Sequence, residues 1–511
     1  MFSRLTTVAL LFLIAGPLRS DDLADKIKAI TDAPEYKAAR WGILVVDAAS
    51  GRTVYEQNAD KLMLPASVTK LYTCANALNE FGPDYRFVTP VVRRGEIKDK
   101  VLDGDLILIA SGDLTFGGRR NKAGATVFAD ADHTYANSGL MDSQVTDTDP
   151  LYALNELAKQ VAKSITEVRG EVLIDDRLFN RARSSGSGPD VVAPILVNDN
   201  VVDVVVTPGA KEGDPAVVKL RPETSMLQVD GDVTTAKAGG STAIGIEAIS
   251  SKLKVRGRIA MGAKAAVRIH SVDDPTVWAR GLFIEALRRN GVTVAAKLDR
   301  PSQAELPARD ADLPRVAEYK SEPFAETIKV TLKVSHNLYA STLPILVGLR
   351  HGSGSAEAGL RQQGKFLKGL GLDSMTVSFA GGAGGANADS VTARTTVGLI
   401  QAMAKHKAAT AYFDALPILG VDGTLAESVP KDSPARGKAR AKTGTLSWYD
   451  SQNQRLVLRS KALGGQIETA KGTKLYFAIF LNDMPLPPGG QPSAQGKVLG
   501  KLCEVIYRHG P

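Results

Sequence analysis

The chain has few of the residue types that metal centres and histidine-dependent catalysis require. Its 511 residues include two cysteines, Cys74 and Cys503, and six histidines. The cysteines are not clustered and no two histidines have helical spacing, so the sequence predicts no metal site and no cofactor. No Ser-His-Asp arrangement can be constructed, which makes a conventional triad the weaker hypothesis. Both cysteines fall on helices, which favours buried thiols, although export would permit a disulfide.

Long apolar runs are also absent beyond the N-terminus. Arg4 precedes an uncharged run over residues 5–18, and Arg19 follows it. This run is too short to span a bilayer and predicts a signal peptide over residues 1–20. The mature protein is therefore expected outside the cytoplasm, where association with a wall or a membrane surface is compatible with the sequence.

Strong charge of one sign is lacking as well. The formal net charge is +8, and the basic residues are spread along the chain rather than grouped in blocks. This balance suits a negatively charged wall polymer, and it equally suits an ordinary solvated surface. Because no nucleic-acid-binding motif accompanies it, the sequence predicts no nucleic-acid partner.

Three short motifs occur in a set order: Ser67-Val-Thr-Lys70, Ser335-His-Asn337 and Lys442-Thr-Gly444. Together they supply a nucleophilic hydroxyl, two amines, a second hydroxyl, a carboxamide and a glycine in an extended segment. A serine acyl-transfer site without a histidine base requires this set. Chance matches also occur: Ser251-Lys-Leu-Lys254 lies in a predicted strand, and Ser451-Gln-Asn453 follows the third motif too closely.

The first motif is predicted at the start of a helix over residues 66–80. Apolar residues recur at i, i+3, i+4 and i+7 from Leu71, which is the pattern of a helix with one buried face. Ser67 and Lys70 then lie one turn apart on one face, and the helix N-terminus favours an oxyanion at Ser67. A free lysine has a pKa of about 10.4. Lys70 is the candidate base if burial or a second cation, for which Lys442 is the candidate, lowers that value.

The region around the first motif resembles a known family. YEQNADKLMLPASVTKLYTCANALNEFGPDYRF (55–87) is similar to the active-site region of the class C low-molecular-mass penicillin-binding proteins. These are the DacB-type D-alanyl-D-alanine carboxypeptidases and endopeptidases. The resemblance continues in order along nearly the whole chain, in SGDLTFG (111–117), EVLIDDRLF (171–179), VNDNVVDVVVTPG (197–209), VDDPTVWARGLFIEALRRNGV (272–292), LPILGVDGTL (416–425) and ARAKTGTL (439–446).

This resemblance implies both a fold and an activity. The implied fold is α/β, with a catalytic domain of the penicillin-binding transpeptidase and β-lactamase type, in which helices flank an antiparallel sheet. The implied enzyme is a penicillin-sensitive serine carboxypeptidase or endopeptidase that forms an acyl-enzyme on Ser67. Its expected partners are peptidoglycan stem peptides and β-lactam inhibitors, in the periplasm or at the extracytoplasmic face of a bacterial cell.

The second motif is expected to serve the leaving group and the substrate. Ser335 and Asn337 are two residues apart, so both can face one cavity while His336 points away. Ser335 is expected to relay a proton toward the leaving amine. Asn337 is expected to hold the substrate amide.

The third motif is expected to bind the substrate along a strand. Lys442 and Thr443 are the candidates for a terminal carboxylate, and Gly444 leaves room for a substrate backbone beside a strand edge. The backbone N–H groups of Ser67 and Thr445 are expected to form the oxyanion hole.

The long interval between the first and second motifs predicts inserted domains. Residues 71–334 exceed what one catalytic loop needs and are rich in alternating Val, Ile and Thr patterns. In the resembled family the insertion forms two domains, one nested in the other. The expected division is a catalytic domain over 21–95 and 316–511, an inserted domain over 96–192 and 268–315, and a nested β-rich domain over 193–267.

Two segments depart from the family pattern. Gly381-Gly-Ala-Gly384 stands where the family usually carries Asp-Gly-Ser-Gly, so an aspartate and a serine are missing from a loop near the site. Residues 447–465 form a longer and more basic hairpin, which either narrows the cleft, reaches toward an anionic polymer, or is solvated without a role.

Two other classes of function compete with the carboxypeptidase. A β-lactamase or related amide hydrolase uses the same motifs, but nothing here resembles the water-activating Glu loop of the class A enzymes. A catalytically silent wall-binding protein is the other alternative, which the altered loop at 381–384 supports and the complete set of motifs opposes.

Overall fold

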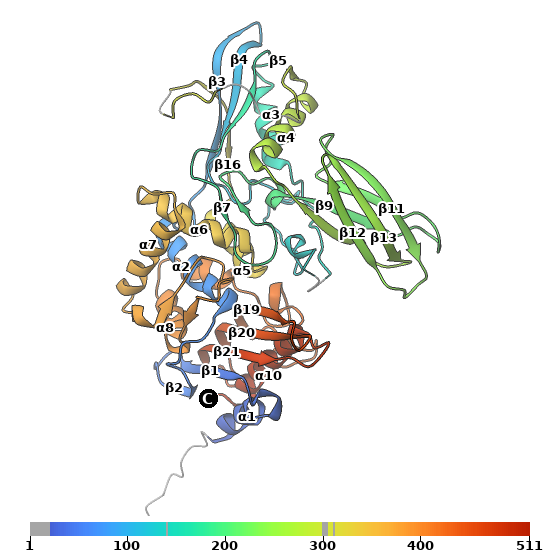
Figure 1. Ribbon diagram of the computed structural model, residues 1–511. Helices are drawn as coiled ribbons and strands as arrows, with labels where there is room; N and C mark the ends of the chain where they lie inside the picture. The colour runs from blue at the N-terminus through green and yellow to red at the C-terminus, as the bar shows by residue number, and fades with distance from the viewer. Residues whose placement is uncertain (1–20, 139–141, 299–304, 310–311) are drawn as a thin grey trace, which may run out of the picture.

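The computed structural model describes residues 21–138, 142–298, 305–309 and 312–511 (Figure 1). The predicted signal peptide, residues 1–20, lies outside this part of the chain, which begins with helix α1 (Asp21–Thr31). Within the described ranges, no helix combines the length and the apolar character needed to cross a bilayer.

A five-stranded antiparallel sheet brings the two ends of the chain together (Figure 1). Its strand order is β19 (Ala439–Asp450), β20 (Arg455–Glu468), β21 (Lys474–Pro485), β1 (Arg40–Asp47) and β2 (Thr53–Gln57). The early strand β1 pairs with the late strand β21 along its whole length. β19 lies at the edge of this sheet, where residues 417–419 bond to its first residues, 439–441. Beyond Ala441, one side of its backbone is available to an added strand.

The sequence predicts strands near 439–446 and 474–482, and both form, as β19 and β21. They do not pair with each other, because β20 lies between them. Most of the basic segment 447–465 forms the end of β19, a turn and the first part of β20. Arg459 and Lys461 alternate with buried Leu458 and Ala462 (Ser460, between them, is also buried). This alternation is typical of a strand, but the many basic residues favoured the interpretation of a solvated hairpin.

Helices cover both faces of this sheet (Figure 1). α1 and α10 (Pro492–His509) pack on one face around one apolar cluster. α2 (Thr69–Phe81) and α8 (Ala393–Ala404) pack on the other face, around a second cluster. The same layer contains α5 (Phe324–Lys333), α6 (Asn337–Arg350), α7 (Ala356–Gly369), α9 (Ala409–Asp414) and the short strand pair β17 (Val377–Ser378) and β18 (Ser390–Val391).

A second, six-stranded sheet lies above this part in Figure 1. Its strands are β15 (Thr293–Val294), β5 (Glu167–Val168), β4 (Val101–Ile109), β3 (Val88–Lys98), β16 (Arg315–Lys320) and β6 (Val172–Asp175), which pairs with β4. α3 (Tyr152–Val161) and α4 (Pro275–Arg289) bury the apolar face of this sheet in a separate core.

The segment predicted as the nested domain, 193–267, and the four residues after it contain mainly strands. One three-stranded sheet contains β10 (Val217–Arg221), β9 (Val201–Thr207) and β14 (Ala266–Ser271), and the other contains β11 (Gln228–Ala236), β13 (Lys252–Ala260) and β12 (Ala243–Ile249). The two sheets share a small apolar core.

The remaining short elements are the strand pair β7 (Ala182–Arg183) and β8 (Val191–Val192) and the 3₁₀ turns η1 (Pro34–Tyr36), η2 (Ala66–Val68), η3 (His133–Tyr135), η4 (Asn198–Asn200), η5 (Ser374–Thr376) and η6 (Gly423–Leu425).

Two of the domain limits predicted from the sequence fall inside strands. The limit at residue 95 divides β3, which pairs with both β4 and β16, and the limit at 267 divides β14. We therefore propose that the insertion extends from β3 to the end of β16, and that the nested part extends to the end of β14, because a strand belongs with its hydrogen-bonded partners.

Candidate active site

Ser67 lies in η2, the turn that leads into α2. The residue before it, Ala66, has φ +46°, a left-handed conformation that costs a non-glycine residue free energy and that active sites often retain. One turn later, Lys70 is fully buried, and its Nζ lies 2.8 Å from the Ser67 Oγ. The structure therefore brings these two predicted residues together as expected.

Lys70 has two further hydrogen-bond acceptors. Its Nζ donates to the Asn337 Oδ1 at 2.8 Å and to the Ala383 carbonyl oxygen at 2.6 Å. Burial lowers the pKa of Lys70 to about 7, against the opposing influence of Cys74 and Asp389. A neutral amine has two N–H groups and one lone pair, so donation to Asn337 and Ala383 directs the lone pair at the Ser67 hydroxyl.

Lys442 lies on β19 and is also fully buried. Its Nζ donates to the Ser335 Oγ at 2.8 Å and to the Thr443 carbonyl oxygen at 2.7 Å. Burial, followed by the nearby charge of Lys70, lowers the pKa of Lys442 well below its ordinary value. Of the two causes that the sequence left open for a lowered pKa of Lys70, burial or a second cation, burial is the main one.

The residues after Lys442 continue along the edge strand. The Thr443 Oγ1 donates to the Thr424 Oγ1 at 2.7 Å, and Thr445 is exposed. A Cβ on Gly444 would lie 2.5 Å from the Pro65 carbonyl oxygen. Gly444 thus permits β19 to pack against the turn that carries the nucleophile, which is a different reason from the space for substrate that the sequence suggested.

The altered glycine-rich loop borders the nucleophile directly. Gly384 has φ +83°, and a Cβ there would lie 1.9 Å from the Ala66 carbonyl oxygen and 3.0 Å from the Ser67 nitrogen. The neighbouring Ala383 supplies the carbonyl that accepts from Lys70. The sequence motifs do not predict this contact, because a residue of any type supplies a backbone carbonyl. The glycines around Ala383 are the sequence feature that indicates a close approach of the backbone here.

The inserted part of the chain also reaches the site. The Asn337 Nδ2 donates to the Ser187 carbonyl oxygen at 2.9 Å, and the Tyr135 hydroxyl donates to the Ser335 carbonyl oxygen at 2.5 Å. Ser335 has φ +62°, a strained conformation that needs support from its surroundings. Tyr135 supports Ser335 directly and Ser187 holds Asn337, and both come from segments far from the motifs in the sequence.

A buried ionic cluster lies behind the second motif. Asp199 is its centre: the Asp199 carboxylate accepts from Arg119 at 2.7 Å and from the Tyr339 hydroxyl at 2.5 Å, and it lies 2.8 Å from the His133 Nε2. The His336 ring stacks on Tyr339 with centroids 3.7 Å apart, so His336 points away from the reaction site as predicted. The cluster ties the start of α6 to the insertion.

The charges of this cluster are stable at neutral pH. Burial alone would lower the pKa of His133, but the carboxylates of Asp203 and Asp132 and hydrogen bonds to Asp199 and Asp203 raise it to about 10. His133 is therefore a cation between carboxylates. Paired in this way, the buried charges avoid the penalty of isolated burial.

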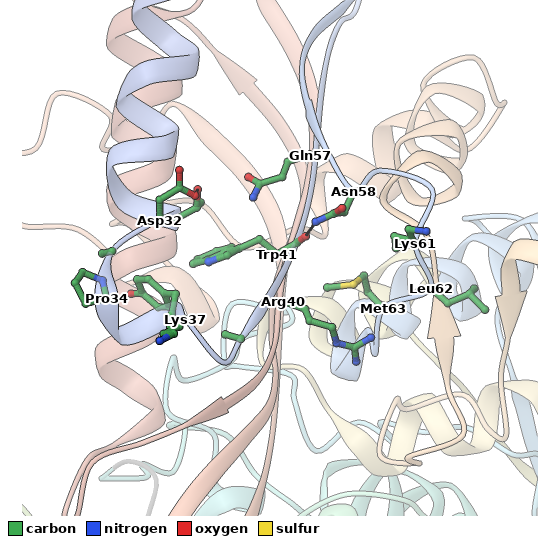
Figure 2. A pocket seen from close by; sticks show the side chains of 14 residues that line it. Asp32, Pro34, Lys37, Arg40, Trp41, Gln57, Asn58, Lys61, Leu62 and Met63 are labelled. Atoms are coloured by element: carbon green, nitrogen blue, oxygen red, sulfur yellow. Dashed lines mark hydrogen bonds between the residues drawn. The ribbon is translucent and has the colours of Figure 1, made fainter.

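A separate cavity of about 870 Å³ is lined by residues of two segments, 31–41 and 57–63 (Figure 2). Asn58 donates to the Trp41 carbonyl oxygen at 2.8 Å at its wall. No residue of the three motifs lines this cavity. It is therefore distinct from the site built around Ser67.

Both cysteines are buried free thiols, which agrees with the favoured expectation. Burial raises the pKa of the Cys74 thiol to about 12, so Cys74 is a poor nucleophile. In the part of the chain that the structure describes, no group of three or more His, Cys, Asp or Glu side chains is arranged to hold a metal ion.

Comparison with known proteins decides the family. The profile of the D-Ala-D-Ala carboxypeptidase 3 (S13) family matches residues 23–496. The chain belongs to this family. A D-alanyl-D-alanine carboxypeptidase of Actinomadura sp. (strain R39) is 29% identical, over 97% of this chain and 87% of that protein. The D-alanyl-D-alanine carboxypeptidase DacB of Haemophilus influenzae is 22% identical, over 86% of this chain and 85% of that protein.

A solved structure shares the fold. The crystal structure of penicillin binding protein 4 (dacB) from Haemophilus influenzae, complexed with a β-lactam, matches with a TM-score of 0.66 and 20% identity. The match covers 96% of this chain and all of that one. The α/β fold predicted from the sequence, with its large insertion, is thereby confirmed.

Proposed function

We propose that this family member is a serine D-Ala-D-Ala carboxypeptidase or endopeptidase that acts on peptidoglycan stem peptides through an acyl-enzyme on Ser67. The observation that carries the proposal is the position of Lys70, with its Nζ 2.8 Å from the Ser67 Oγ and a pKa lowered to about 7. At that pKa the amine is available as a base near neutrality, where general-base catalysis is most effective.

In the acylation step, the Ser67 Oγ attacks the carbonyl carbon of the penultimate D-alanine and Lys70 accepts the hydroxyl proton. The backbone N–H groups of Ser67 and Thr445 hold the oxyanion of the tetrahedral intermediate. The C–N bond then breaks, and one proton passes to the departing amine. Ser335, hydrogen-bonded to Lys442, is the relay for that proton.

Deacylation completes the cycle. A water molecule gives its proton to Lys70 and attacks the acyl carbon, and the Ser67 oxygen leaves with a proton. A β-lactam acylates the same hydroxyl, which makes it an inhibitor when deacylation is slow.

We also propose export of the protein, guided by residues 1–20, because its substrate lies outside the cytoplasm.

Labelling with a fluorescent penicillin tests this function. We expect covalent label on Ser67 in the wild type, slow loss of that label, and release of D-alanine from an N-acyl-D-Ala-D-Ala peptide. Ser67→Ala should abolish labelling without changing the unfolding midpoint, because the hydroxyl makes no short side-chain contact besides that with Lys70. Rapid label loss would indicate a β-lactamase, and absence of label a catalytically silent protein. Label on another serine would contradict the assignment of Ser67.

A further inference from the structure

Lys461 is a cation beside the substrate strand that none of the three motifs includes. It lies on β20 directly opposite Thr445 of β19, and its Nζ donates to the Thr445 Oγ1 at 2.8 Å. The side chain is half-buried, and its far end lies next to Gly496 of α10, where an added Cβ would be 3.3 Å from the Lys461 Cε. Lys461 is therefore held at the strand that carries the third motif.

Lys461 also lacks a counter-ion within the described part of the chain. The nearby arginines of β20 do have one: Arg459 pairs with Asp483 at 2.6 Å, and Arg455 with Asp450 at 3.5 Å. Burial lowers the pKa of Lys461 to about 8, so it remains mostly protonated at neutral pH. A partly desolvated cation without an anion is a favourable neighbour for an incoming carboxylate.

Lys442 is poorly suited to the role of carboxylate-binding cation that its motif suggests. It is fully buried, it donates to Ser335 and to the Thr443 carbonyl, and its pKa is lowered well below the ordinary value. Lys442 therefore lies beneath the strand, and its hydrogen bonds are directed at Ser335 and at the Thr443 carbonyl oxygen. A cation nearer the exposed part of the strand is better placed to contact a free carboxylate.

We propose that Lys461, together with the Thr445 hydroxyl, binds the C-terminal carboxylate of the D-Ala-D-Ala substrate and sets the preference for a free carboxyl end. Thr445 is exposed on the edge strand and already accepts from Lys461, so a carboxylate that receives the Thr445 O–H also lies within reach of the ammonium. The inference rests on the proposed function and extends it, since it names the residue that selects the substrate.

The test compares two substrates that differ only at the C-terminus: an N-acyl-D-Ala-D-Ala acid and its C-terminal amide. Lys461→Gln removes the charge but keeps a donor for Thr445. We expect kcat/KM for the acid to fall by about tenfold, the range of a charge-assisted hydrogen bond at a half-buried site, with little change for the amide. Lys461→Arg should restore much of the preference for the acid.

Lys474→Met is the matched control, because it removes an exposed lysine from β21, near the other end of the sheet. It should leave both substrates unaffected. Equal losses of kcat/KM on acid and amide with Lys461→Gln, or no loss on either, would overturn the inference and leave the proposed function intact.

If the wild type releases no D-alanine, the proposed function fails instead. The inference is then decided by acylation rates with penicillin and its methyl ester, of which Lys461→Gln should slow only the first.

Discussion

At the scale of single residues, the chemistry depends on how two buried lysines are partnered. Lys70 has three oxygen neighbours, and only one of them, Ser67, carries a proton that it can remove. Lys442 faces Ser335 and donates to a backbone carbonyl. The two lysines thus have different hydrogen-bond partners, and the proposed mechanism gives them different tasks, one as base and one as a neighbour that orients the relay hydroxyl.

The protonation of Lys70 predicts the pH dependence of acylation. Because burial lowers its pKa to about 7, the amine is a cation below that pH and a free base above it. The second-order rate constant for acylation by penicillin should therefore rise as the pH increases through about 7, and stopped-flow or quench measurements from pH 5 to 9 check this.

Lys70→Arg provides the control for this pH profile. Arginine retains its proton at all usable pH values, so acylation should fall by at least about a hundredfold, the usual contribution of general-base catalysis. An arginine variant that acylates at a near-normal rate would exclude Lys70 as the base.

At the scale of elements, the site is assembled from turns and loops held against regular structure. The η2 turn, the edge strand β19, the start of α6 and the loop between β17 and β18 each contribute one part. Two close backbone approaches to the turn that carries Ser67 depend on glycines, Gly444 on β19 and Gly384 in the loop. The departure of this loop from the family pattern therefore leaves its backbone role in place.

Gly384→Ala tests that role. Its φ of +83° and the 1.9 Å contact of the new Cβ with the Ala66 carbonyl oxygen would displace the loop and remove the Ala383 acceptor from Lys70. We expect acylation by penicillin to slow by about 5- to 100-fold, which corresponds to about 1–3 kcal/mol of strain and lost hydrogen bonding.

Gly381→Ala is the matched control in the same loop. A Cβ there meets only the Ser185 Oγ, at 4.0 Å, so acylation should remain unchanged. If both variants acylate like the wild type, the loop does not position Lys70.

At the scale of the whole molecule, the insertion is part of the active site rather than an appended module. Tyr135 and Ser187 hydrogen-bond to the second motif, and the buried ionic cluster around Asp199 lies behind it. Folding of the insertion and the geometry of Ser335 are therefore linked.

Asp199→Asn should expose this link. Removal of the charge leaves Arg119 and His133 buried with less compensation, which should lower the free energy of unfolding by about 3–5 kcal/mol. Denaturant unfolding measures that loss, and penicillin acylation of the folded fraction should slow in parallel. Asp232→Asn, at an exposed position of the nested sheets, should change neither quantity. Wild-type acylation in folded Asp199→Asn would show that the cluster stabilises the fold without positioning Ser335.

The residue pattern alone predicts the candidate site residues and the helix that carries the first two of them. Ser67 and Lys70 are neighbours because helical spacing places residues three apart on one face, and that relation needs no tertiary contact. The helix of the first motif follows from local periodicity in the same way. β20 was missed because its basic residues outweighed the alternation.

Contacts between distant segments could not be predicted from the residue pattern. The Ala383 carbonyl, the Ser187 carbonyl, Tyr135 and Lys461 carry no motif, and each reaches the site through pairing or packing between segments far apart in the chain. The lowered pKa of Lys70 also depends on tertiary packing, because burial of the side chain by surrounding elements produces it. The position of a backbone carbonyl and the burial of a side chain both depend on how distant segments pack, so no local residue pattern predicts them.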